Sequence, residues 1–574
     1  MTTRSSVPAG ATADSGTARE AAPHPTLPTR TTAWVRQTLI DGQELALLDV
    51  REEAPFAEAH PLFAANLPLS RLELEAWARI PRRDTPILVM DDGEGLAQRA
   101  GLGLRTLGYT DVALLDGGLS GWRNAGGELF RDVNVPSKAF GELVESKRHT
   151  PSLSAQEVKA LLDAKADVVV LDARRFDEYA TMSIPGGISV PGAELALRVR
   201  ALAPDPATQV IVNCAGRTRS IIGTQSLVNV GIPNPVAALR NGTIGWTLAG
   251  QTLEHGQGRR FGTVSSEIRA DAARGARAVA DRAGVGRATR AQLDAWFHEP
   301  KRTTYLFDVR TPEEFLAGHL PGAVSAPGGQ LVQETDHSVP VRGARIVLVD
   351  DDGVRANMSA SWLAQMHWDV HVLDGLGADA FSETGSPHRP LPAPAVAAAT
   401  VSAAELADWL GLTQAPADAQ TTNTPVVVID VGPSAAYVKA HVPGAWFAIR
   451  AQLPQALARI HATLAAVAGQ TEPAARYVLV SPDGLLAAYA AADLAALQPQ
   501  ARVFVLDGGS AAWSAAGLPT GTGEQRLASP RIDRYRRPYE GTDNPVEAMQ
   551  GYLDWEFGLV EQLRRDGTHG FFVI

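Results

Sequence analysis

Short apolar runs that end in aspartate recur four times along the chain, at residues 45–49, 168–172, 305–308 and 426–430. A second apolar run of strand length follows each of them, at 86–90, 210–213, 345–349 and 477–480, and leads into a helix-like stretch. Strands that alternate with helices in this way are typical of a parallel sheet flanked by helices on both faces. The repeating unit is about 120 to 135 residues long, which is the size of a whole domain. The pattern therefore predicts four tandem α/β domains, each a mainly parallel sheet with helices on both faces.

The segments between the repeats predict where the domains begin and end. Residues 1–29 are rich in Thr, Ala, Ser and Pro, which predicts a disordered leader. Residues 132–150 are polar and irregular in composition, residues 264–283 favour a connecting helix, and residues 384–398 are rich in proline. The predicted domains span 30–131, 150–256, 288–385 and 398–521, with a linker helix in 257–287 and a tail in 522–574.

The tail contains one amphipathic stretch, residues 544–567. Asn544 is the expected N-cap of this helix and Pro545 its first-turn residue. Its apolar face predicts a helix that docks on one of the domains. A helix that binds a partner protein is the alternative.

Composition narrows the class of protein without naming an activity. The chain of 574 residues carries a net charge of −11, which argues against nucleic acid as a partner. Its longest apolar runs have the length of strands, so no membrane span is expected. The single cysteine excludes an internal disulfide and a cysteine-based zinc site, and the sequence predicts no metal and no cofactor. A reducing, cytoplasmic location is the simplest expectation.

That cysteine, Cys214, lies in the stretch VIVNCAGRTRSIIG, directly after the second apolar run of the second repeat. A gapless alignment of the four repeats on this run places Asp91, Asp351 and Pro482 at the position of Cys214. The same alignment places Leu96, Ala356 and Ala487 at the position of Arg219. Only the second repeat thus combines a thiol with basic residues, and the other three repeats are predicted to be inactive.

A loop between a strand and a helix N-terminus suits a reactive thiol. Its backbone N–H groups and the positive end of the helix dipole form a cradle for an anion. The position predicts a lowered pKa for Cys214. Arg217 and Arg219 add charge for an anionic substrate. An aspartate at the cysteine position would accept the same N–H groups and fill the cradle permanently.

These motifs resemble the rhodanese (thiosulfate sulfurtransferase) family, and in particular its multi-domain bacterial members, over about residues 30–520. The resemblance rests on the following residues: Asp172 and Arg174, Pro185 and Gly186, the loop Cys214–Arg219, and Asn241, Gly242, Gly245 and Trp246. It implies a double displacement in which a thiolate takes the outer sulfur of a donor such as thiosulfate. The resulting persulfide then passes that sulfur to a thiophilic acceptor.

The resemblance assigns a role to each residue of the candidate site. Cys214 carries the persulfide, and Arg217 and Arg219 bind the charged end of the donor. The remaining loop residues, whose N–H groups would stabilise the outer sulfur, are Ala215, Gly216, Thr218 and Ser220. Four residues are expected to support the site structurally: Asp172, Arg174, Asn241 and Trp246. Arg174 could pair with Glu178, four residues later, if the segment is helical.

Other functions stay open at this point. The tyrosine-phosphatase pattern has five residues between cysteine and arginine, whereas four separate Cys214 from Arg219, so a phosphate or arsenate activity is disfavoured. Mercaptopyruvate is an alternative donor, although Ala215 and Arg217 depart from the loop usual in that subclass. A scaffold that senses persulfide without turnover is the non-enzymatic alternative. Because no second thiol exists, the acceptor must be external, such as glutathione, thioredoxin, dihydrolipoate or cyanide.

Overall fold

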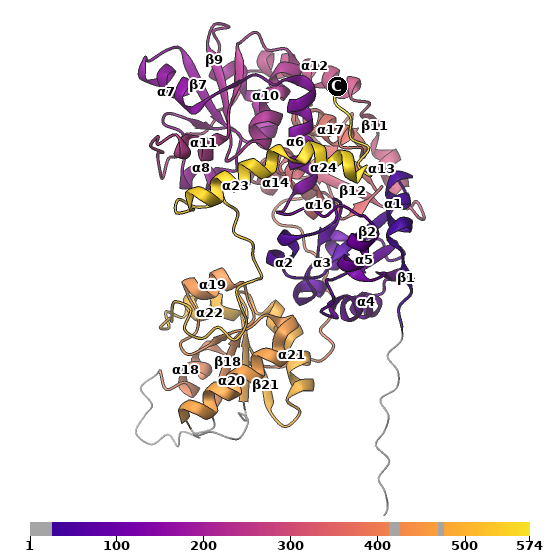
Figure 1. Cartoon of the computed structure of the whole chain (residues 1–574), viewed down its shortest axis with the longest axis vertical. Coiled ribbons are helices and arrows are strands. Elements are labelled where there is room, and N and C mark those ends of the chain that lie inside the picture. The colour runs from indigo at the N-terminus through magenta and orange to yellow at the C-terminus, as the bar shows by residue number, and fades with distance from the viewer. Residues whose placement is uncertain (1–25, 413–424, 469–475) are drawn as a thin grey trace, which may run out of the picture.

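Four parallel sheets organise the chain, as the repeats predict (Figure 1). The computed structural model describes residues 26–412, 425–468 and 476–574. Most of the predicted leader, residues 1–25, lies outside this range, but Thr29 belongs to the first strand and not to the leader. In the second domain the sheet order is β6-β10-β9-β7-β8, and the other three domains repeat this order with their own strands. The prediction of four α/β domains is confirmed.

The first two domains have the same sequence of elements. Those of the first are β1 (Thr29–Arg30), α1 (Thr32–Ile40), β2 (Leu45–Asp49), α2 (Glu53–Glu58), β3 (Ala65–Asn66), η1 (Leu69–Arg71), α3 (Leu72–Arg79), β4 (Ile87–Met90), α4 (Leu96–Thr106), β5 (Val112–Leu115) and α5 (Gly118–Asn124). Those of the second are β6 (Ser152–Leu153), α7 (Ala155–Asp163), β7 (Val168–Asp172), α8 (Phe176–Thr181), β8 (Ile188–Ser189), η2 (Gly192–Glu194), α9 (Leu195–Leu202), β9 (Gln209–Asn213), α10 (Thr218–Val230), β10 (Val236–Leu239) and α11 (Gly242–Leu248).

The third and fourth domains vary this plan slightly. The elements of the third are β11 (Gly286–Ala288), α13 (Arg290–Phe297), β12 (Thr304–Asp308), α14 (Pro312–Ala317), β13 (Val324–Ser325), α15 (Gly328–Gln333), α16 (Thr335–Ser338), β14 (Val341–Arg342), β15 (Arg345–Val349), α17 (Arg355–Gln365), β16 (Asp369–Leu373) and η3 (Ala378–Ala380). Those of the fourth are β17 (Ala399–Val401), α18 (Ala403–Trp409), β18 (Val426–Asp430), α19 (Ser434–Lys439), β19 (Trp446–Phe447), η4 (Arg450–Gln452), α20 (Leu453–Ala468), β20 (Arg476–Val480), α21 (Leu485–Leu497), β21 (Arg502–Leu506) and α22 (Gly509–Ala515).

A buried aspartate ends the central strand of every domain, and in three of them it is paired with arginine. In the second domain, Arg174 donates to both carboxylate oxygens of Asp172, at 2.9 and 2.7 Å, and to the carbonyl of Met182 at 2.6 Å. Such a bidentate pair compensates the cost of burying both charges. The expected pairing of Arg174 with Glu178 is therefore wrong, because Arg174 lies before α8 and turns back to Asp172.

A helix occupies the segment predicted to be an irregular linker between the first two domains. This helix, α6, spans Val135–Arg148, and nine of its residues are buried. Apolar side chains recur at helical spacing within it, at Val135, Ala139, Phe140, Leu143 and Val144. The prediction for residues 132–150 is wrong because the polar residues between them obscured this stripe. The linker helix between the second and third domains, α12, spans Ser266–Arg282.

The domains also contact one another out of sequence order. Strand β14, from the third domain, pairs antiparallel with β2 of the first, at the edge of the first sheet. The fourth domain reaches back to the first through an ion pair of 2.5 Å between Arg450 and Glu73. Between the second and third domains, Arg355 pairs with Glu194 at 2.8 Å.

The C-terminal tail leaves the fourth domain and crosses back over the other three (Figure 1, yellow). It contains two helices, α23 (Val546–Phe557) and α24 (Leu559–Asp566), in place of the single helix expected over 544–567. Pro545 is the N-cap residue rather than Asn544, whose side chain donates to the carbonyl of Glu540. The apolar side chains Met549, Tyr552 and Leu553 of α23 pack against Ile244 of α11. The tail thus docks on the second domain.

The buried aspartate of the fourth domain, Asp430, has no arginine partner, because Gly432 stands where the arginine would be. The stability of this domain should therefore depend on pH. Burial raises the pKa of Asp430 to about 7, well above an unfolded value of about 3.9. The folded state thus holds an extra proton between these values, and stability falls as the pH rises from about 4 to about 7. We expect Asp430→Asn to remove this dependence and to stabilise the fourth domain at pH 8 by about 2 kcal/mol.

Hydrogen exchange in urea, read by mass spectrometry, reports the unfolding of each domain separately. The matched control is Asp308→Asn in the third domain. It leaves Arg310 buried without its carboxylate, so it should destabilise that domain at every pH by about 3 kcal/mol. Equal pH dependence in wild type and Asp430→Asn would contradict the prediction.

Candidate active site

Cys214 directly follows β9, where the chain turns into α10, and it is only 2% exposed. Its thiol donates to the hydroxyl oxygen of Ser220 at 3.4 Å, and that hydroxyl donates to the carbonyl of Arg217 at 2.8 Å. The carbonyl of Cys214 accepts from the amide of Thr243 on α11 at 2.9 Å. The loop is therefore held at both ends, by the helix that follows it and by α11.

The amide groups of this loop are unpaired. Among the described residues, none of the backbone N–H groups from Ala215 to Arg219 donates a hydrogen bond. Buried amides without partners are rare, and several that converge at a helix N-terminus form a site for an anion or an electron-rich sulfur. The geometry supports the cradle expected from the sequence.

The cysteine position in the third and fourth domains differs from the expectation. The strand register pairs Asp172 with Asn213, Asp308 with Val349, and Asp430 with Val480. The residues after these partners are Cys214, Asp350 and Ser481, so the placement of Asp351 and Pro482 at this position is wrong. In both domains the loop glycine, Gly353 or Gly484, lies one residue further from the strand than Gly216 does, so an alignment that matches these glycines is displaced by one residue. In the first domain, Asp91 is placed as expected.

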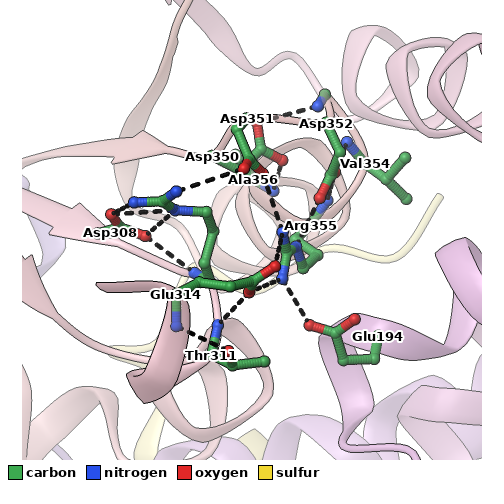
Figure 2. Close-up of polar contacts among 12 residues, drawn as sticks. Glu194, Asp308, Thr311, Glu314, Asp350, Asp351, Asp352, Val354, Arg355 and Ala356 are labelled. Atoms are coloured by element: carbon green, nitrogen blue, oxygen red, sulfur yellow. Dashed lines mark hydrogen bonds and ion pairs between the residues drawn. The ribbon is translucent and has the colours of Figure 1, made fainter. Parts of the chain in front are cut away.

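Carboxylates occupy the equivalent amides in the inactive domains. Asp91 accepts from the amides of Gly93 at 3.2 Å and Ala97 at 3.0 Å. Asp350 accepts from those of Gly353 at 3.0 Å and Ala356 at 2.8 Å (Figure 2). The loop amides of Gly93 and Gly353 are thus satisfied by an aspartate, whereas those of Ala215–Arg219 are unpaired among the described residues.

The same shift in register corrects the position of Arg219. Five residues after the cysteine position stand Leu96, Arg355 and Leu486, so the assignment of Ala356 and Ala487 is wrong. Arg355 pairs with Glu314 at 2.5 Å, as Arg219 pairs with Glu178 at 2.7 Å. Figure 2 shows Arg355 among four further carboxylates, those of Glu194, Asp350, Asp351 and Asp352. The third domain therefore keeps the arginine of the active loop, while Asp350 replaces the thiol and Ala356 replaces Ser220.

Both arginines of the active loop are already paired with carboxylates. Arg217 turns away from the loop toward α6, where it pairs with Glu142 at 2.7 Å and with Glu145. Arg219 donates to both oxygens of Glu178 at 2.7 and 2.9 Å. Burial alone would raise the pKa of Glu178, but the guanidinium of Arg219 lowers it to about 2, so this pair is ionised. Arg217 therefore does not face an anion beside Cys214, contrary to expectation.

The expected low pKa of Cys214 is also absent. Burial raises the pKa of the thiol, while the nearby Arg219 and the hydrogen bonds with Ser220 lower it less. Glu556 of α23 adds to the increase, because a carboxylate opposes a nearby thiolate. The tail that covers the loop, which no local sequence pattern reveals, opposes the effect of the cradle and of Arg219 on the thiol.

Glu556 itself was not expected at the site. It is fully buried, and its Oε1 accepts from the hydroxyl of Tyr552 at 2.8 Å, while Oε2 has no partner among the described residues. Burial raises the pKa of Glu556 to about 8. The space beside Gly216 is occupied by Tyr552 and Glu556, which shows that α23 lies on the loop. Glu556 falls within the tail helix expected from the sequence, but nothing in that pattern placed the helix against Cys214.

The expected supporting residues lie around the loop. Asn241 adopts a left-handed conformation with φ of 62°, and its side-chain oxygen accepts from Arg217 at 3.1 Å. Trp246 is fully buried, and its indole donates to the carbonyl of Thr252 at 2.9 Å. Asn213 joins the loop to the Asp172 pair by donating to Asp172 at 2.9 Å. These contacts fix the start of the loop and its α11 side.

A cavity of about 340 Å³ lies beside the loop, with Arg219 and Glu178 on its wall. Residues of the second domain, the third domain and the C-terminal tail line it together. No cluster of three or more His, Cys, Asp or Glu residues suited to a metal ion occurs in the described part of the chain. In the same part, none of the helices is both long and apolar enough to cross a membrane.

The combination of a parallel sheet, an amide cradle and one buried thiol defines a class of protein. The rhodanese-like domain family matches the chain four times, at residues 31–125, 154–249, 289–383 and 413–516. The chain belongs to this family, and the resemblance noted in the sequence is confirmed.

Solved structures extend this result. A thiosulfate sulfurtransferase from Pseudomonas aeruginosa is 69% identical, with a TM-score of 0.90, and the match covers 96% of this chain and all of that one. The 3-mercaptopyruvate sulfotransferase SseA from Escherichia coli is 20% identical, with a TM-score of 0.21, over 40% of this chain and 99% of its own. The Alr3790 protein from Anabaena is 25% identical, with a TM-score of 0.17, over 18% of this chain and 84% of its own. A comparison with curated protein sequences gave no match.

An aspartate at position 214 should reproduce the inactive loops. We expect Cys214→Asp to lose sulfur transfer and to stabilise the second domain by about 1 kcal/mol relative to Cys214→Ser, because a carboxylate can accept the loop amides. Chemical unfolding of the two variants measures the difference. Equal stability, or a less stable aspartate variant, would show that the loop amides do not favour a fixed carboxylate.

Removing the charge of Glu556 should favour the thiolate. We expect Glu556→Gln to lower the pH at which Cys214 ionises and to raise the thiolate fraction about two- to fivefold at pH 9, where Glu556 is mostly ionised. Since Cys214 is the only cysteine, absorbance at 240 nm against a Cys214→Ser blank reports it directly. The control is Glu561→Gln on α24, whose partner is Arg564 at the surface and which should change nothing. An unchanged titration in Glu556→Gln would exclude the coupling.

Proposed function

We propose that this chain is a sulfurtransferase that moves sulfane sulfur from thiosulfate to a thiophilic acceptor through a persulfide on Cys214. The observation that carries the proposal is the contrast between the loops: aspartates accept from the loop amides of Gly93 and Gly353, while the amides of Ala215–Arg219 beside Cys214 are unpaired among the described residues. The similarity to the thiosulfate sulfurtransferase from Pseudomonas aeruginosa supports the same donor.

The reaction proceeds in two displacements. In the first, the thiolate of Cys214 attacks the outer sulfur of thiosulfate, a new S–S bond forms, the S–S bond of the donor breaks, and sulfite leaves with its electron pair. The persulfide sulfur then lies in the amide cradle of Ala215–Ser220. In the second, the acceptor attacks that outer sulfur and carries it away, which returns Cys214 to the thiolate.

The role of each supporting residue follows from its contacts. Ser220 is hydrogen-bonded to the sulfur of Cys214 and can donate to it once the thiol has ionised. Arg219, held by Glu178, places positive charge beside the thiolate. Asp172 and Arg174 fix the end of β7 next to β9, and Asn241 and Trp246 fix the α11 side of the loop.

The acceptor is a molecule outside this chain, because the only thiol is the one that carries the sulfur. Glutathione, thioredoxin, dihydrolipoate and cyanide all have the required nucleophile. We place the reaction in the cytoplasm, because a cysteine without a disulfide partner stays reduced there. A scaffold that only senses persulfide is the second candidate, favoured by the three domains without a cysteine.

Intact-protein mass spectrometry after brief treatment with thiosulfate tests the proposal. The wild type should gain about 32 Da, the mass of one sulfur atom, and Cys214→Ser should gain none. Excess cyanide or glutathione should remove the added mass with repeated turnover. A gain of mass without repeated turnover would favour the sensing scaffold. No gain of mass with thiosulfate, mercaptopyruvate or polysulfide would refute sulfur transfer.

A further inference from the structure

The second and third domains meet through matching segments of sequence. Residues 191–195 read PGAEL and residues 327–331 read PGGQL, and both follow the short strand at the edge of their sheet. The two segments pack closely, since a Cβ added to Gly329 would lie 3.0 Å from the backbone nitrogen of Gly192. The fourth residue of each segment is therefore placed where the two domains adjoin.

In one direction this fourth residue is a carboxylate that crosses between the domains. Glu194 of the second domain pairs with Arg355 of the third at 2.8 Å (Figure 2). Arg355 also pairs with Glu314 at 2.5 Å, with Asp351 at 3.0 Å and with Asp352 at 2.6 Å. Four carboxylates thus engage the arginine of the inactive loop.

In the other direction most of these carboxylates are absent. At the same offset in sequence that relates Arg219 to Arg355, neutral residues replace three of them: Gln330 for Glu194, Ala215 for Asp351 and Gly216 for Asp352. Within the residues that the structure describes, Glu178 is the only carboxylate paired with Arg219. Burial raises the pKa of Cys214, and the charge of Arg219 is the strongest influence against that increase. An arginine with few carboxylate partners is what a nearby thiolate requires.

Gln330 lies close enough to act on Arg219. It is half-buried and lines the cavity of about 340 Å³ together with Arg219 and Glu178. Burial raises the pKa of Glu334, the residue that follows α15, and a hydrogen bond from Gln330 acts against this increase. The charges of Arg175 and Arg219 do the same, so all of these groups lie together. Among them, Gln330 contributes a hydrogen bond and no charge.

We propose that Gln330 is a positioning residue that the third domain contributes to the active site of the second. Its neutral side chain leaves Arg219 with one carboxylate partner, so that the guanidinium group stays beside Cys214 and stabilises the thiolate and the persulfide. A glutamate at position 330 would engage Arg219 as Glu194 engages Arg355. The inference rests on the proposed sulfur transfer for its purpose, but the charge of the thiol can be measured without turnover.

The test restores the missing carboxylate. Gln330→Glu should draw the charge of Arg219 toward the third domain and lower the thiolate fraction of Cys214 at pH 9 at least threefold. Absorbance at 240 nm reports this fraction against the same variant that also carries Cys214→Ser. The initial rate of persulfide formation from thiosulfate at pH 9 should fall by a similar factor, because the thiolate is the nucleophile. Glu556 of α23, the carboxylate that also acts on this thiol, is the same in all variants.

Three further variants separate the effect of charge from that of shape. Gln330→Met, which is neutral and of similar length, should change the thiolate fraction less than half as much. Gln292→Glu adds the same charge to the exposed first turn of α13 in the same domain, and should leave the thiolate fraction as in the wild type. Combining Gln330→Glu with Glu178→Gln should restore part of the lost fraction, because Arg219 then has one carboxylate again.

The outcomes distinguish this inference from the proposed function. An equal thiolate fraction in wild type and Gln330→Glu, or an equal loss in Gln330→Met, would overturn the role of Gln330 and leave sulfur transfer untouched. If the wild type forms no persulfide while Gln330→Glu still lowers the thiolate fraction, sulfur transfer fails and the positioning of Arg219 stands.

Discussion

The backbone amides of the loop need an electron-rich hydrogen-bond acceptor, and this need determines the arrangement around Cys214. Each strand-to-helix loop of this fold directs backbone N–H groups inward, and buried N–H groups must be paired. Two domains meet the need with an aspartate, at positions 91 and 350. A carboxylate is a permanent partner, whereas a thiolate and its persulfide are temporary ones. The residue that follows the strand thus decides whether the loop amides are occupied permanently.

The tail changes the electrostatics of this loop. It buries Cys214 beneath α23, places the carboxylate of Glu556 nearby, and so raises the pKa of the thiol. A thiol with a raised pKa reacts slowly until the charge around it changes. The carboxylates of α6 keep Arg217 paired and turned away from the thiol.

Much of this architecture could be predicted because it depends on local patterns. Strand runs that end in aspartate fixed the four domains, and the single cysteine indicated the site. The predictions that were wrong concern contacts between segments far apart in sequence. The register of β12 with β15 moved the cysteine position from Asp351 to Asp350, a displacement of one residue that only the pairing of the strands reveals. Likewise, no local signal showed that Glu142 would neutralise Arg217, since the two residues are 75 positions apart.

The path of the tail also has a consequence for biosynthesis. Ribosomes add residues from the N-terminus, and domains generally fold as they emerge. The second domain, with Cys214, can fold while more than half of the chain is still unmade. Its loop is covered only after residues 546–557 have been synthesised and have crossed back from the fourth domain. The nascent chain therefore exposes its one thiol to the cell until translation is complete.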